Sequence, residues 1–214
     1  MPRALKILFF SLIVRPIVLV VLGLNIRDRH KLPVTGPAII IANHNSHLDA
    51  MVLMSLYPLS MIHKVRPVAA ADYFLANRIK AWFSLNVIGI IPLSRQGGVN
   101  RDEMFAACHA ALDKGDILIL FPEGTRGEPE QAVKPKKGLY YLVKDRTDTA
   151  IIPVVIHGLG RALPRGEALL VPFNCDVVVG DPLPPVASSD ALIAVLTETY
   201  ARLSQHCLTR TTLK

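Results

Sequence analysis

Two short runs of apolar residues constrain the fold of this chain more than any other feature of its sequence. Residues 38–42 read AIIIA and residues 117–121 read ILILF, and each run is bounded by turn-forming or polar residues. Uninterrupted apolar runs of this length are typical of strands with both faces buried. Helical patterns occupy the stretches between such strands, so we predict an α/β fold with a largely parallel mixed sheet flanked by helices.

The rest of the chain continues this alternation of strands and helices. Further strands are predicted at residues 65–70, 87–93, 151–156 and 176–179, and helices at residues 46–57, 72–86, 100–114, 137–145 and 188–208. A chain of 214 residues is long enough for one substantial core and short for two. We therefore expect a single domain over residues 30–214.

An apolar segment at residues 7–24 precedes this pattern. Basic residues flank it on both sides, and as one helix it would be about 27 Å long, barely enough to cross a bilayer core. Arg15 and Pro16 interrupt it with a charge that is costly in hydrocarbon and a missing backbone donor. We expect residues 1–29 to associate with membranes as a broken helix in the bilayer interface, with Arg15 at headgroup level. A transmembrane span and a buried core helix are the alternatives.

The composition indicates an anionic partner. The net charge is +7, hydrophobic residues make up 51% of the chain, and the mean hydropathy of +0.37 is high for a freely soluble protein. Nucleic-acid binders usually concentrate basic residues in a patch with interleaved aromatics. Here the basic residues are dispersed and aromatics amount to only 6%. We therefore predict an anionic membrane surface as a partner, and no nucleic acid.

The cysteines indicate neither a disulfide scaffold nor a zinc site. Cys108, Cys175 and Cys207 are far apart and show no metal-ligand spacing, which fits a reducing compartment. A nucleophile–base pair of Cys108 and His109 is disfavoured, because neighbours on a helix point in different directions.

The first polar cluster, NHNSHLD at residues 43–49, follows directly after the AIIIA strand. A histidine that leaves a buried strand can accept a hydroxyl proton at neutral pH, and a carboxylate can fix its tautomer. His44 and Asp49 form such a pair only if His44 lies in the turn and Asp49 in the first helical turn. Two alternatives are open: Asp49 and Ser46 form a helix capping box, or His44, His47 and Asp49 bind a metal.

The second polar cluster, FPEGTRG at residues 121–127, begins as the ILILF strand ends. Its glycines let the backbone approach a ligand closely, and the amide groups, the Thr125 hydroxyl and the Arg126 guanidinium suit a phosphate. A polar turn with an incidental arginine is the alternative. In parallel sheets ligands bind at the carboxyl ends of the strands, and both clusters lie there.

Together these residues resemble the glycerolipid acyltransferase family, of the lysophosphatidate (1-acyl-sn-glycerol-3-phosphate) acyltransferase type. The family's NHxSxxD block is matched by residues 43–49 and its FPEGTR block by residues 121–126. An apolar run that ends at Arg95 and an isoleucine–proline strand at residues 151–154 are similar to its other two blocks, in the same order. Ser94 departs from the pattern, since an acidic or amide residue is common beside the arginine.

The resemblance implies roles for particular residues. His44 and Asp49, the HX4D pair, are the expected catalytic residues, with His44 as general base and Asp49 holding it. The residues expected to bind the acceptor phosphate or glycerol are Arg95, Glu123, Gly124, Thr125 and Arg126. Acyl-CoA or acyl carrier protein is the expected co-substrate, with no metal, no other cofactor and no covalent acyl-enzyme.

The expected reaction transfers a fatty acyl group to lysophosphatidate and gives phosphatidate for phospholipid biosynthesis. We expect it at the cytoplasmic membrane, with the acyltransferase domain on the cytoplasmic face. A close alternative is another lyso-lipid acceptor, such as a lyso-ornithine lipid or a lysophospholipid in remodelling. A metal-dependent hydrolase and a non-catalytic membrane-surface protein are the alternatives from other classes.

Overall fold

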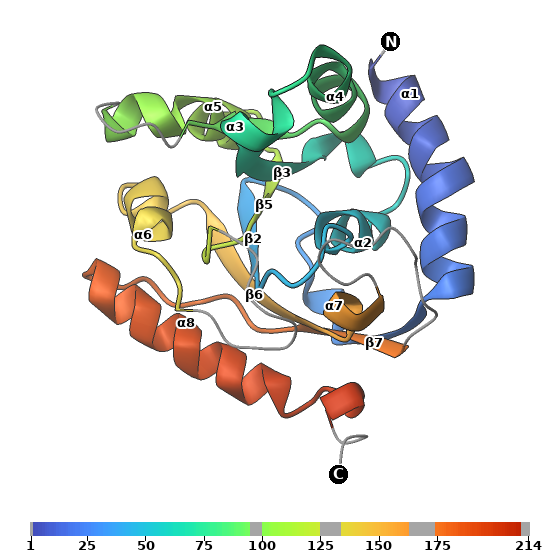
Figure 1. Ribbon diagram of the computed structural model, residues 1–214. Helices are drawn as coiled ribbons and strands as arrows, with labels where there is room; N and C mark the ends of the chain where they lie inside the picture. The colour runs from blue at the N-terminus through green and yellow to red at the C-terminus, as the bar shows by residue number, and fades with distance from the viewer. Residues whose placement is uncertain (1, 95–99, 125–133, 163–173, 211–214) are drawn as a thin grey trace.

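The structure, a computed structural model, describes residues 2–94, 100–124, 134–162 and 174–210 of the chain (Figure 1). The described residues form a seven-stranded sheet in the order β1-β7-β6-β2-β5-β3-β4. The strands are β1 (Gly23–Arg27), β2 (Ala38–Ala42), β3 (Val65–Ala70), β4 (Ile91–Leu93), β5 (Ile117–Leu120), β6 (Ala150–His157) and β7 (Asn174–Val179). All neighbouring strands run parallel except β6 and β7, which are antiparallel. The predicted α/β fold with a largely parallel mixed sheet is confirmed.

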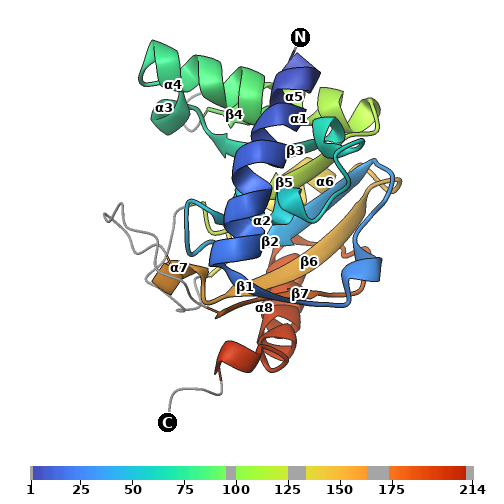
Figure 2. The ribbon, with the colours of Figure 1, turned by 90° about the vertical axis from the view of Figure 1, so that its right-hand side faces the viewer.

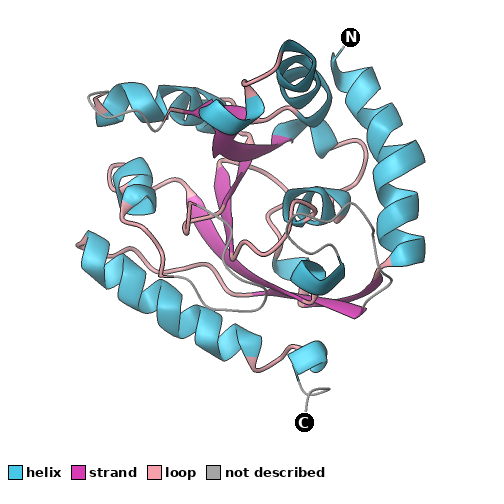
Figure 3. Ribbon diagram, in the orientation of Figure 1, coloured by secondary structure: helices cyan, strands magenta, loops and turns pink. Residues whose placement is uncertain are grey.

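Helices cover both faces of the sheet (Figure 3). They are α1 (Pro2–Phe9), α2 (Asp49–Ser55), α3 (Ala71–Phe74), α4 (Arg78–Phe83), α5 (Arg101–Asp113), α6 (Gly138–Val143), α7 (Leu159–Ala162) and α8 (Ser189–Ser204). On the central strand β2, Ile40 belongs to the core shared with α2 and the N-terminal helix, whereas Ile39 and Ile41 face the core shared with α5, α6 and α8. Both faces of β2 are therefore buried, which explains why its sequence is apolar without alternation.

The predicted helix at 72–86 and the strand at 87–93 differ from the structure in detail. Asn77 interrupts the helix, because its side-chain oxygen accepts the amide N–H of Ile79 and so caps α4 as a new helix. After α4 a π-helical segment, Ser84–Ile88, continues to Gly89, whose φ of 77° ends it. The strand that follows is short, and β4 pairs only with the end of β3.

The N-terminal apolar segment forms a continuous helical path rather than the expected broken helix. Helix α1 runs into π-helical segments at Phe10–Val14 and Ile17–Val21, and the residues between them are helical too. The wider turns lie on both sides of Pro16, which has no amide N–H to donate. The Arg15 guanidinium donates a hydrogen bond to the carbonyl of Tyr57 at 2.7 Å, and its expected place at headgroup level stays a prediction.

One face of this helical path is part of the protein core, and the other is exposed. Phe10, Val14 and Val18 pack in the core beneath the sheet. On the opposite face Leu12 is 65% exposed and Leu19 is 75% exposed. A simple apolar count does not separate these two faces, because both carry large aliphatic or aromatic side chains.

Two further contacts join this N-terminal region to the sheet. Lys6 is buried and donates a hydrogen bond from Nζ to the carbonyl of Val65 at 2.9 Å, and its burial lowers the pKa of the amine to about 7. Strand β1, which the sequence analysis did not predict, pairs with β7 at the sheet edge. Among the described residues no helix is both long and apolar enough to cross a bilayer.

Phe10→Ala should destabilise the protein by about 3–5 kcal/mol, because it removes a fully buried ring from the core. The matched change on the exposed face, Leu12→Ala, should alter the free energy of unfolding by no more than about 0.5 kcal/mol. Urea denaturation of the two variants measures both values. Equal losses would contradict the division of the helix into a core face and an exposed face.

Candidate active site

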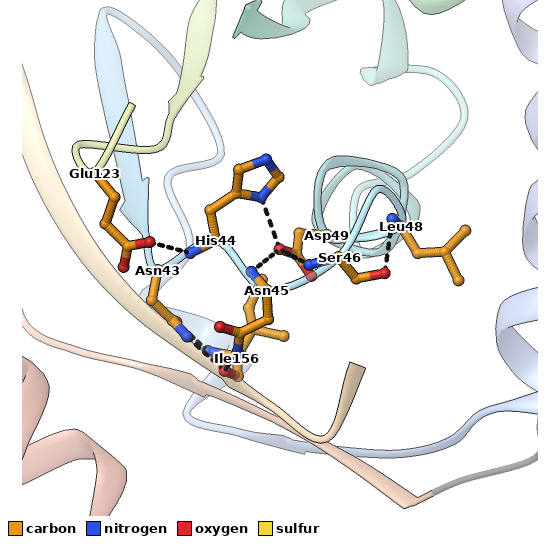
Figure 4. Close-up of polar contacts among 8 residues, drawn as sticks. All are labelled: Asn43, His44, Asn45, Ser46, Leu48, Asp49, Glu123 and Ile156. Carbon is orange, nitrogen blue, oxygen red and sulfur yellow. Dashed lines mark hydrogen bonds and ion pairs between the residues drawn. The ribbon is translucent and has the colours of Figure 1, made fainter. Parts of the chain in front are cut away.

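The candidate site begins where β2 ends. The loop at residues 43–48 leaves the carboxyl end of β2 and leads into α2, whose first residue is Asp49. His44 lies in the loop and its Nδ1 is 2.9 Å from Oδ2 of Asp49 (Figure 4). This is the geometry that a base and its orienting carboxylate require, with the histidine in the turn and the acid in the first helical turn.

Asp49 is completely buried, and a single oxygen of its carboxylate organises the loop. Oδ2 accepts hydrogen bonds from the amide N–H of Asn45 at 2.7 Å and of Ser46 at 2.9 Å, besides the contact with His44. The bond to the Ser46 N–H resembles one half of a capping box. Helix α2 nevertheless begins at Asp49 with Leu48 as its N-cap, and Leu48 makes no side-chain capping bond. The Asp49 side chain therefore holds the loop before the helix and contacts His44 at the same time.

Two asparagines fasten the same loop to the neighbouring strand β6. The Asn43 side chain accepts the amide N–H of Ile156 at 2.7 Å and donates to its carbonyl at 2.8 Å. Asn45 donates to that carbonyl as well, at 3.1 Å. These bonds hold the loop against the carboxyl end of the sheet, so the position of the imidazole does not depend on its one side-chain contact alone.

The His44 ring is held between its acid and an aromatic face. It stacks on Phe121, with ring centroids 4.2 Å apart and an angle of 22° between the planes. A carboxylate accepts but does not donate, so Nδ1 carries the proton toward Asp49 and Nε2 is the basic nitrogen. The side chain also lines a cavity, which is where an incoming hydroxyl would meet the basic nitrogen.

That cavity has a volume of about 510 Å³ and a mostly apolar lining. Phe9 of α1 and Phe83 of α4 contribute to it, with their rings in an edge-to-face contact at 5.2 Å. Tyr73 and Lys80 line it as well. The sequence analysis named none of these four residues, because they come from three helices and no motif marks them. The volume and apolar lining suit an acyl chain.

Glu123 occupies a different place from the one expected of a substrate-binding residue. It is only 3% exposed, and its carboxylate lies beside the loop and accepts the backbone N–H of His44 at 3.3 Å (Figure 4). Burial raises the pKa of this carboxyl to about 7, and the nearby Asp49 contributes to the rise. Its role in binding the acceptor stays a prediction, whereas its contact with the catalytic loop is observed.

Of the other expected substrate-binding residues, Gly124 lies at the cavity, with a φ of 74° that a side chain would rarely adopt. A Cβ atom at this position would be 3.0 Å from Nζ of Lys136. Arg95, Thr125 and Arg126 lie outside the described residues, and their predicted roles remain predictions.

Two alternative chemistries find no support in the geometry. His44, His47 and Asp49 do not form a metal-binding group, and the part of the chain that the structure describes has no other cluster of three potential ligands. The His47 ring instead stacks on Tyr73, at 5.8 Å. Cys108 is fully buried in the core, and burial raises the pKa of its thiol to about 12, so it is no nucleophile.

Comparison with known proteins shows the family of this chain. A family model described as Acyltransferase matches residues 23–157, which include the HX4D pair and residues 121–126. The chain belongs to the acyltransferase family. A chloroplastic 1-acyl-sn-glycerol-3-phosphate acyltransferase of Arabidopsis thaliana is 29% identical over 162 residues, and the match covers 75% of this chain and 43% of the relative. The 1-acyl-sn-glycerol-3-phosphate acyltransferase alpha of Mus musculus is 26% identical, with coverage of 77% and 55%.

This chain spans about half the length of these relatives. Among solved structures, the 1-acyl-sn-glycerophosphate acyltransferase PlsC of Thermotoga maritima superimposes with a TM-score of 0.71. The superposition covers 100% of this chain and 81% of that one, at 18% sequence identity. This likeness shows that the two chains have the same fold.

Glu123→Gln should flatten the pH dependence of stability between about pH 4.5 and 7. In this range the unfolded chain releases the Glu123 proton while the folded chain keeps it, so stability falls as the pH rises. Above pH 7 the Glu123 carboxyl lowers the free energy of unfolding by at most about 3 kcal/mol. Glutamine stays neutral and its carbonyl oxygen can still accept the His44 N–H.

Urea denaturation at pH 5, 6, 7 and 8 measures this difference. The exposed Glu198→Gln controls for the loss of one negative charge. If Glu123→Gln and wild type lose stability in parallel from pH 5 to pH 8, the buried carboxyl does not take up a proton on folding.

Proposed function

We propose that this protein transfers a fatty acyl group from an acyl thioester to the free hydroxyl of lysophosphatidate, which gives phosphatidate. The observation that carries the proposal is the placement of His44, held by Asp49 through Nδ1, at the wall of a large apolar cavity. The names of the relatives in the acyltransferase family support the same acceptor.

The reaction is proposed to proceed without a covalent acyl-enzyme. Nε2 of His44 accepts the proton of the acceptor hydroxyl as its oxygen attacks the thioester carbonyl. Asp49 stabilises the imidazolium that forms. When the tetrahedral intermediate collapses, the carbon–sulfur bond breaks and the thiolate takes the proton from Nε2, so the histidine returns to its starting state.

The expected substrate-binding residues belong to this proposal. Gly124 lies beside the cavity, and Arg95, Thr125 and Arg126 are proposed to contact the acceptor phosphate or glycerol, as is Glu123. The donor is acyl-CoA or acyl carrier protein, and no further cofactor is proposed. Another lyso-lipid acceptor requires the same chemistry at His44 and differs only in the headgroup.

His44→Ala should lower the rate of CoA release by about 10²–10⁴, because it removes the general base. The assay supplies acyl-CoA with lysophosphatidate, a lyso-ornithine lipid or a neutral lysophospholipid, and measures free CoA. The matched change His206→Ala removes an exposed histidine and should leave the rate unchanged.

The panel of acceptors also separates the proposed acceptor from its alternatives. Preference for lysophosphatidate supports phosphatidate formation, and preference for a phosphate-free acceptor contradicts it while preserving the mechanism. Wild type that is inactive with every acceptor, with either CoA or acyl carrier protein as donor, would contradict the proposed enzyme.

We further propose that residues 1–29 associate with an anionic membrane surface and that residues 30–214 form the catalytic domain on its cytoplasmic side. The support is the exposed apolar face of the N-terminal helical path, which includes Leu12, Leu19 and Val20. The segment that follows α4 packs beside α1 (Figure 2), and Trp82 on α4 is exposed as well. Exposed apolar side chains of this kind, on a basic protein, suit a lipid interface.

Leu19→Glu should weaken binding to vesicles of anionic phospholipid by about tenfold or more, because a carboxylate replaces an apolar side chain in the proposed interface. Sedimentation with vesicles measures the bound fraction. Leu208→Glu alters a leucine of similar exposure far along the chain and should bind as wild type does. If the two variants bind equally well, the N-terminal face is not the membrane contact.

A further inference from the structure

One cation that lines the cavity belongs to no sequence motif. Lys80 of α4 lines the cavity, and its Nζ lies 3.2 Å from the centroid of the Tyr73 ring and 5.5 Å from that of Phe74. Among the described residues no carboxylate forms an ion pair with Lys80. The ammonium group is thus held against aromatic faces rather than neutralised.

The aromatic support of Lys80 is connected to the catalytic loop. The face of Tyr73 stacks on His47, at a centroid distance of 5.8 Å and an angle of 15°. His47 lies three residues after His44 in the same loop, and both histidines line the same cavity as Lys80. A row of side chains therefore runs from the base-bearing loop to the ammonium group.

A cation–π contact positions an ammonium group without using up its hydrogen-bond capacity. The contact contributes about 0.5–1 kcal/mol at an exposed site and directs the group, but it satisfies no lone pair. Lysine has three N–H donors, and a phosphate is the ligand that a compact cation of this kind commonly binds. In an otherwise apolar lining such a cation attracts an anion more strongly than it would in water.

We propose that Lys80 binds a phosphate group of a substrate at the mouth of the cavity. The proposal rests on the proposed function for the identity of the substrates, both of which carry phosphate: the lyso-lipid acceptor, and the CoA or carrier-protein donor. The chain bound in the apolar cavity and the phosphate bound by Lys80 then fix the substrate at two points. This is a specificity contact separate from the residues of the FPEGTR block.

A binding experiment tests the site independently of turnover. Isothermal titration calorimetry measures the binding of each ligand directly. Titration with CoA and, separately, with glycerol 3-phosphate gives a dissociation constant for each phosphate source. Lys80→Met should weaken the binding of one of them by about tenfold, and Lys80→Arg should retain it.

Lys114→Met removes the same charge from an exposed lysine at the end of α5 and is the matched control. A loss confined to CoA assigns the donor phosphate to Lys80, and a loss confined to glycerol 3-phosphate assigns the acceptor phosphate. The site would be overturned if Lys80→Met bound both ligands with the dissociation constants of wild type. It would also be overturned if Lys114→Met lost as much affinity as Lys80→Met.

Kinetics give a second test that separates this inference from the proposed function. Lys80→Met should raise the KM for the assigned substrate by about tenfold with kcat nearly unchanged, since the contact holds the substrate without touching the reacting atoms. If the donor is assigned, the effect should vanish when an acyl-N-acetylcysteamine thioester, which has no phosphate, replaces acyl-CoA. Failure of wild type to turn over any substrate contradicts the proposed function, whereas the titrations still decide the phosphate site.

Discussion

The site depends on one oxygen atom, Oδ2 of Asp49. It accepts two backbone N–H groups and lies against the imidazole of His44, so a single buried carboxylate shapes the loop and orients the base. Charge-assisted hydrogen bonds of this kind are strong, and they compensate a group that would be costly to bury unpaired. All of these contacts are made by Oδ2, so the oxygen of a neutral amide could accept the same N–H groups. The negative charge of an acid is required instead by the imidazolium that forms when His44 takes up a proton.

The sheet determines where this carboxylate can act. Strand β2 lies between β5 and β6, and the loops that follow β2 and β5 therefore meet at one edge. This brings Glu123, 79 positions away in sequence, beside the backbone of His44, and the ring of Phe121 against its imidazole. The antiparallel strand β7 lies outside this arrangement, beyond β6. The parallel centre of the sheet is the part on which the site is built.

The structure could be predicted from the sequence where the local pattern of apolar residues matches the burial of those residues in the fold. The runs at 38–42 and 117–121 are apolar throughout because both faces of these strands are covered, so their uninterrupted apolar sequence located them. The strand-end rule then placed the two polar clusters together. The spacing of His44 and Asp49 left their contact as one of several alternatives, and the resemblance to the acyltransferase family favoured it. Glu123 was located at the right strand end, but its buried position beside the loop depends on packing that no local pattern encodes.

The N-terminal segment shows why the remainder could not be read from sequence. Some of its apolar residues lie in the core and others at the surface. Hydropathy does not distinguish them, because Phe10 in the core and exposed Leu12 are both strongly apolar. Arg15 was expected at headgroup level because a charge inside an apolar run is costly, and its hydrogen bond to the backbone carbonyl of Tyr57 could not be read from that pattern. The cavity was missed for a similar reason. Its wall is assembled from helices distant in sequence, and their aromatic residues resemble ordinary core positions until the tertiary structure brings them together.

The same helix links the proposed membrane contact to the cavity. Phe9 lines the cavity, Phe10 packs in the core and Leu12 is exposed, so one turn of helix touches all three environments. Buried Lys6, one turn earlier, ties this turn to the start of β3. Because the helix is rigidly attached on its inner face, a bilayer in contact with its outer face would lie beside the cavity wall. An acyl chain would then pass between lipid and cavity over a short apolar path, which is less costly than a path through water.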